Sequence, residues 1–89
     1  MVERSDEYII GRLIERSRLL IALSEEIPVE RKLETQPLLK QLEQALAVPA
    51  AEQDRERVRA LYATLYSELV DYADLEALLS AMRNFVPYL

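Results

Sequence analysis

Residues 61–79, LYATLYSELVDYADLEALL, contain three of the chain's five tyrosines and the point at which the pattern of apolar residues changes. Wound at about 100° per residue, the residues before this point form one apolar stripe. Its members are Val58, Leu61, Tyr62, Leu65, Leu69 and Tyr72. If the winding continued, Glu76 would fall in the centre of that stripe, where an unpaired carboxylate is costly to bury. The sequence therefore predicts a break between Tyr72 and Asp74, with Asp74 capping a new helix.

A second set of apolar residues supports this break. On one continuous helix the set would point roughly 130° away from the earlier stripe. It consists of Leu75, Leu78, Leu79 and Met82. Residues 50–85 contain neither proline nor glycine, so helix propensity alone would allow a single long helix. The prediction of two helices at an angle therefore depends on the change in the direction of the apolar side chains.

The composition favours helices joined by few turns. The 89 residues suffice for one domain, residues 1–89, and are 51% hydrophobic and 30% charged, which is typical of a globular chain. One glycine and four prolines leave little material for turns. We predict an all-α fold, a small four-helix and mostly antiparallel bundle.

The first helix is expected to begin at Ser5, which two acidic residues follow, and to end near Leu23 or Glu25. Ser17 and Ser24 lie in the middle of its apolar stripe and are small enough to let a neighbouring helix approach closely. The stripe itself consists of Ile9, Ile10, Leu13, Ile14, Leu20 and Ile21.

Residues 24–37 interrupt this pattern and are expected to form the longest connection, because they contain Pro28 and end at Pro37. Pro37 is suited to the first turn of a second helix, with Thr35 as its cap. The apolar side of this helix consists of Leu38, Leu39, Leu42, Ala45 and Leu46. A third helix is expected to begin near Ala50, just after Pro49, which ends the second.

Several classes of function are disfavoured. The chain has no cysteine and no histidine, so thiolate zinc sites and imidazole catalysis are excluded, and we expect no cofactor and no bound metal. Glu68, Asp71 and Asp74 have a spacing that could gather carboxylates around a cation, but this spacing is weak evidence, and we interpret them as a solvated helix face and a cap. The net charge of −5 disfavours nucleic acid and anionic membrane surfaces.

The location of the protein is inferred from its apolar runs. The longest, residues 19–23, is far shorter than the roughly 20 residues that span a bilayer, and the first residues lack the apolar core of a signal peptide. We expect a cytoplasmic protein.

The first helix carries a second, smaller apolar strip outside its core stripe. Leu19 and Leu23 lie beside Arg12 and Arg16, in line with Tyr8. Leucine and tyrosine flanked by arginine are typical of the centre of a protein interface. In a monomer, the connection after this helix would instead have to cover the strip.

The three tyrosines of residues 61–79 are predicted to have different roles. Tyr62 and Tyr72 flank the stripe of the third helix, so their rings should bury against the first helix with their hydroxyls at the rim. Tyr66, next to Val70, should be only half covered. The predicted partner interface therefore consists of Tyr8, Arg12, Arg16, Leu19, Leu23, Tyr66 and Val70.

These features favour a protein-interaction module, of an adaptor, chaperone-like or regulatory kind, that forms a homodimer and has no catalytic activity. The alternative is a small all-helical enzyme that binds an anionic substrate through Arg12 and Arg16. The apolar tail FVPYL, residues 85–89, either folds back on the thin core or is captured by a partner.

Overall fold

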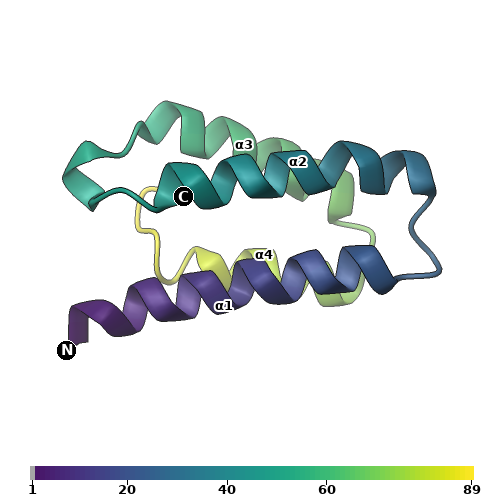
Figure 1. Cartoon of the computed structure of the whole chain (residues 1–89), viewed down its shortest axis with the longest axis horizontal. Helices are drawn as coiled ribbons and strands as arrows, with labels where there is room; N and C mark the ends of the chain where they lie inside the picture. Colours follow the sequence, from purple (N-terminus) through teal and green to yellow (C-terminus); the bar gives the residue numbers. More distant parts are fainter. Residues whose placement is uncertain (1) are drawn as a thin grey trace.

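The computed structural model describes the backbone of residues 2–89 and the side chains from Asp6 onward. Residues 2–89 form four α-helices and one short 3-10 helix (Figure 1). They are α1 (Val2–Leu23), α2 (Val29–Leu46), η1 (Ala50–Glu52), α3 (Arg55–Leu69) and α4 (Ala73–Met82). No helix in this part of the chain has the length and apolar character needed to cross a lipid bilayer.

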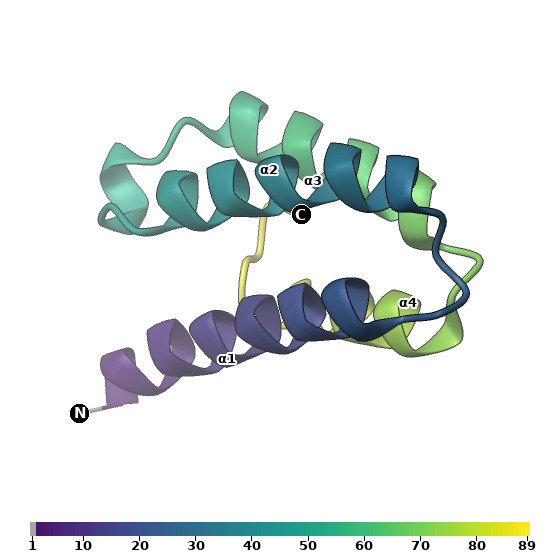
Figure 2. The ribbon, with the colours of Figure 1, turned by 45° about the vertical axis from the view of Figure 1, so that its right-hand side comes forward.

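The helices are arranged as two stacked pairs. The α2 helix packs along α3, and α1 packs along α4 (Figures 1 and 2). Further contacts join α1 to α2 and α3 to α4, so the order around the bundle axis is α1, α2, α3, α4. The predicted all-α, mostly antiparallel four-helix bundle is confirmed.

The predicted apolar stripes form the core. Its fully buried apolar side chains come from all four helices, and they are Ile21, Leu39, Leu42, Val58, Leu65, Leu69, Leu79 and Met82. Ser17 is buried among them, and its hydroxyl donates to the carbonyl of Leu13 at 2.8 Å. Ser24 instead lies directly after the last residue of α1, and its hydroxyl accepts from the amides of Glu26 and Ile27 at 3.1 and 3.3 Å. Both serines therefore have partners for their hydroxyls.

The predicted break between the third and fourth helices is present. The α3 helix ends at Leu69, and α4 begins at Ala73 after Tyr72, whose backbone is extended (φ −102°, ψ 106°). The predicted cap is wrong, because Tyr72 occupies the N-cap position and Asp74 lies in the first turn of α4. An acidic side chain in the first turn still interacts favourably with the helix dipole.

The prediction for the second helix is wrong at its start. The connection is short, residues 24–28, because Ile27 inserts into the core and Pro28 directly precedes the first residue of α2. Pro37 consequently lies inside the helix rather than at its start. Thr35 is not a cap: it is buried in mid-helix and its hydroxyl donates to the carbonyl of Arg31 at 2.7 Å.

Two other helix starts also differ from the expectation. The α1 helix begins at Val2, so Ser5 lies within it rather than at its N-cap. The α3 helix begins at Arg55, because Asp54 caps it by accepting from the amide of Arg57 at 3.2 Å. Residues 50–52 form the separate η1 turn, and the extended backbone of Gln53 separates it from α3.

Candidate functional site

The predicted strip on α1 is exposed. Tyr8, Leu19 and Leu23 are 65, 49 and 76% exposed. Arg12 and Arg16 are also exposed, and the Arg12 guanidinium lies 5.9 Å from the centre of the Tyr8 ring. The connection after α1 leaves the strip uncovered, because its apolar residue Ile27 turns into the core instead. The interpretation in which this connection hides the strip is therefore wrong.

The α2 helix adds two exposed apolar side chains beside this strip. Val29 is 69% and Leu33 is 70% exposed. The sequence prediction missed them because it placed both residues in a connection. Their spacing of four residues on a helix that starts directly after Pro28 would have been the signal.

Two hydrogen bonds tie α2 alongside α1 at this point. Lys32 Nζ donates to the carbonyl of Ala22 at 3.0 Å, and Gln36 Nε2 donates to the carbonyl of Arg18 at 3.2 Å. From the winding of the two helices about this seam we infer that both apolar pairs face outward on the same side. We call the surface formed by Leu19, Leu23, Val29 and Leu33 the hairpin face.

Charged residues lie at both ends of the hairpin face. Arg12 and Arg16 lie on α1 before the leucines, Glu25 and Glu26 lie in the connection after them, and Glu30 lies in the first turn of α2, all exposed. Within α1, Arg18 pairs with Glu15, and this hydrogen-bonded ion pair lowers the pKa of the Glu15 carboxyl. The face is thus basic at one end and acidic at the other.

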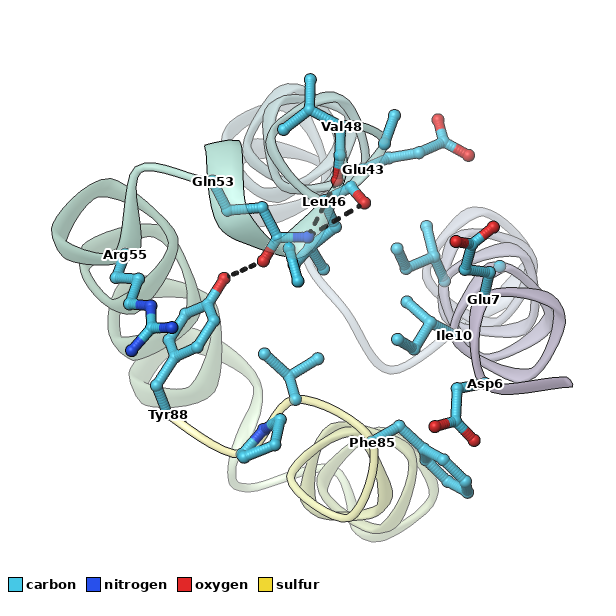
Figure 3. A pocket seen from close by; sticks show the side chains of 16 residues that line it. Asp6, Glu7, Ile10, Glu43, Leu46, Val48, Gln53, Arg55, Phe85 and Tyr88 are labelled. Atoms are coloured by element: carbon cyan, nitrogen blue, oxygen red, sulfur yellow. Dashed lines mark hydrogen bonds between the residues drawn. The ribbon is translucent and has the colours of Figure 1, made fainter. Parts of the chain in front are cut away.

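Tyr66 and Val70 lie on a different side of the molecule. The Tyr66 hydroxyl donates to Glu76 on α4, and the Arg83 guanidinium lies 5.1 Å from the centre of the Tyr66 ring. Val70 is 41% exposed near the end of α3. Since α1 and α3 are diagonal to each other in the bundle, the seven predicted interface residues form two separate surfaces (Figure 3).

The other two tyrosines of residues 61–79 anchor the bundle. Tyr62 is 4% exposed and its hydroxyl donates to the carbonyl of Leu79, and burial raises the pKa of this phenol. Tyr72 is half-buried at the rim, where its hydroxyl accepts from Arg31 at 3.2 Å. Their hydrogen bonds go to α4 and α2, and the bond of Tyr62 is buried, so the predicted position of its hydroxyl at the rim is wrong.

The C-terminal tail folds back on the core, which decides between the two predicted alternatives. Val86 is 3% exposed, and Tyr88 and Leu89 pack partly buried against the core. The Tyr88 hydroxyl donates to the side-chain oxygen of Gln53. The backbone carbonyl of Tyr88 accepts from the Arg59 side chain at 2.9 Å. Burial also raises the pKa of the Tyr88 phenol.

A cleft of about 870 Å³ lies between this tail, the N-terminal half of α1 and the end of α2 (Figure 3). Its apolar lining includes Ile10, Ile14, Leu46 and Val86, and its acidic lining is Asp6, Glu7 and Glu43. Gln53 forms part of the lining, and its side-chain amide nitrogen donates to the backbone carbonyls of Leu46 and Val48 at 3.4 and 3.1 Å. Sequence reasoning missed the cleft, because residues far apart in the chain line it.

The carboxylates considered for a metal site are dispersed. Glu68 lies 3.5 Å from Arg31 of α2, Asp71 lies in the turn, and Asp74 lies on α4. In the part of the chain that the structure describes, no three Asp or Glu side chains gather as they would around a metal ion.

Arg12 and Arg16 line neither of the two clefts that we describe. The first is the cleft at the end of the bundle, and the second, of about 410 Å³, lies along α3 and the tail and is lined in part by Arg59, Tyr62, Tyr66 and Arg83. The geometry around Arg12 and Arg16 thus gives no support to the alternative of an enzyme that uses them to enclose a substrate.

Neither a known protein family, nor a curated protein, nor a solved structure matches this chain.

Proposed function

We propose that this chain is a protein-interaction module that forms a homodimer through its hairpin face. The observation that carries the proposal is the exposure of four large apolar side chains, by 49 to 76%, on one side of α1 and α2. Contiguous exposed apolar surface of this kind is typical of interaction sites. Burying it between two copies would remove it from water and stabilise the pair.

The distribution of charge favours a second copy as the partner. Dimers with a two-fold axis use the same patch on both subunits, so the patch must be complementary to itself. An axis passing between Leu19 and Leu23 would bring the basic end of the face on one copy to the acidic end on the other. Arg16 would then lie near Glu26 of the partner subunit, at the rim of the apolar contact.

The proposed contact between the two hairpin faces is small, and its size determines the affinity that we expect for the dimer. Standard interfaces bury about 800 Å² on each partner, and four apolar side chains with their charged neighbours reach at most that size. We expect a dissociation constant on the order of micromolar. A module with such an affinity suits an adaptor or regulatory role, in which exchange between partners is required.

Light scattering coupled to size-exclusion chromatography tests the proposal. Leu19→Glu with Leu23→Glu places charge in the centre of the face, so the mass should fall from that of two chains to that of one. Circular dichroism should remain helical, since both side chains are exposed. The matched control is Ala60→Glu with Thr64→Glu, which adds the same charge at the same spacing on an exposed side of α3 and should leave the dimer intact. A wild-type chain that is monomeric at high micromolar concentration would refute the homodimer.

A further inference from the structure

Gly11 lines the cleft at the end of the bundle, and it is the only glycine of the chain. It lies within α1, where glycine is less favourable than alanine. Its φ is not positive, and a Cβ atom added to it would meet nothing within 4 Å in the part of the chain that the structure describes. Neither the backbone conformation nor close packing therefore requires glycine here. Its effect is to leave space in the cleft that a side chain would occupy.

The charges around the cleft are predominantly negative. Its lining contains three carboxylates, those of Asp6, Glu7 and Glu43, against one guanidinium, that of Arg55. Arg55 lies on the α3 side, 5.1 Å from the centre of the Tyr88 ring, whereas the carboxylates come from α1 and α2 (Figure 3). The carboxylates do not gather as metal ligands do. The rim therefore favours a cationic group of a larger ligand over a bare metal ion.

The shape of the cleft favours a compact ligand. Its volume of about 870 Å³ is within the range of small-molecule sites. Side chains from α1, the end of α2, residues 50–55 and the tail line the space (Figure 3). Aliphatic side chains, among them Ile10, Leu46 and Val86, line its interior. Such a site combines an apolar interior with charges at the edge, which is usual for sites that bind amphipathic molecules.

We propose that this cleft binds a small amphipathic organic cation, with the apolar body of the ligand against Ile10, Leu46 and Val86 and its ammonium group near Glu7 and Glu43. Gly11 keeps the necessary space open. The proposal is independent of self-association through the hairpin face, which lies at the other end of α1.

The test is a pair of NMR titrations of the full chain with two probes of equal apolar body and opposite charge, 4-phenylbutylammonium and 4-phenylbutyrate. The ammonium probe should shift the amide signals of Gly11, Leu46, Gln53 and Val86, and it should bind about tenfold more tightly than the carboxylate probe. Equal affinity for the two probes, absence of binding at millimolar concentration, or shifts confined to the hairpin face would each overturn the proposal.

Variants test separately the carboxylates at the edge of the cleft and the space beside Gly11. Glu7→Gln with Glu43→Gln should weaken binding of the ammonium probe severalfold and leave the carboxylate probe unchanged or tighter. The charge-matched control, Glu25→Gln with Glu26→Gln at the other end of the bundle, should leave both affinities unchanged. Gly11→Leu should abolish binding and raise the melting temperature, whereas Gly11→Ala should raise the melting temperature and retain binding. Retention of full affinity by Gly11→Leu would contradict the assigned cavity.

Discussion

The hydroxyl of Tyr66 donates a hydrogen bond to the carboxylate of Glu76 at 2.7 Å and so joins α3 to α4 across the turn between them. Glu76 also accepts from the hydroxyl of Ser80, likewise at 2.7 Å. Glu76 is the residue that could not continue the apolar stripe of α3. The break in the helix moves its carboxylate to the edge of the bundle, where two hydroxyls stabilise its charge.

This contact changes the expectation for Tyr66. An interface tyrosine would contribute to association and little to folding, whereas a ring that packs against α4 contributes to the stability of the monomer. We expect Tyr66→Ala to lower the free energy of unfolding by about 1 to 2 kcal/mol. The loss should be the same at two protein concentrations in chemical denaturation. A loss that grows with concentration would restore Tyr66 to an interface.

Tyr62 provides the comparison, since it is the more deeply buried ring. Tyr62→Ala removes a large core side chain and leaves the carbonyl of Leu79 without its donor. We expect a loss of about 3 kcal/mol or more in the same denaturation experiments. Equal losses for the two tyrosines would show that their different burial has no energetic consequence.

Glu76 should make stability depend on pH. Its hydrogen bonds with Ser80 and then with Tyr66 lower the pKa of its carboxyl in the folded state. A lowered pKa stabilises the fold above the pKa of the unfolded chain, about 4.3 for glutamate, and this stabilisation is lost as the pH falls through the folded value. Urea denaturation at pH 7 and at successively lower pH should show a smaller decline for Glu76→Gln than for wild type. Parallel curves would contradict this role.

The two aspartates near helix starts should differ in their effect on stability. Asp54 accepts a hydrogen bond from the amide of Arg57, so Asp54→Ala should cost about 1 kcal/mol. Asp74 lies one position beyond the start of α4 and interacts with its dipole, so Asp74→Ala should cost only about 0.3 to 0.5 kcal/mol. Thermal denaturation of both variants measures the difference. The reverse order would restore Asp74 as the cap.

The proposed dimer predicts a charge swap across its two-fold axis. Arg16→Glu should raise the dissociation constant severalfold, because it places an acid opposite Glu26 of the partner subunit. Adding Glu26→Arg to the same chain should restore most of the affinity. Sedimentation equilibrium of the two variants and wild type measures this. Additive losses, with no restoration in the double variant, would exclude this orientation of the two copies.

Hydrophobic periodicity by itself determined the main features of the fold. The stripe through Val58, Leu65 and Leu69 predicted the buried side of α3, and the position of Glu76 predicted the break before α4. These predictions hold because burial of apolar side chains on one side of a helix depends mainly on spacing along the chain. The exposed strip around Leu19 and Leu23 was predictable for the same reason.

The residues at which the helices begin could be assigned only from the tertiary structure. Pro37, as a potential first residue, and Thr35, as a potential cap, were plausible from sequence, yet burial of Ile27 draws the chain into the core and allows α2 to begin directly after Pro28. Local capping preferences amount to about 1 kcal/mol, and the burial of one large apolar side chain is larger than that.

The hairpin face, the contact between Tyr66 and Glu76 and the cleft all depend on the packing of segments that are distant in the chain. No pattern within one helix indicates that Tyr66 meets Glu76, that Val29 and Leu33 extend the strip of α1, or that the tail closes beside α1. The cleft exists because residues near both termini and near the end of α2 lie together around the space beside Gly11. Periodicity specifies which side of a helix is buried, whereas the neighbour of each exposed side depends on contacts between residues that are remote in the chain.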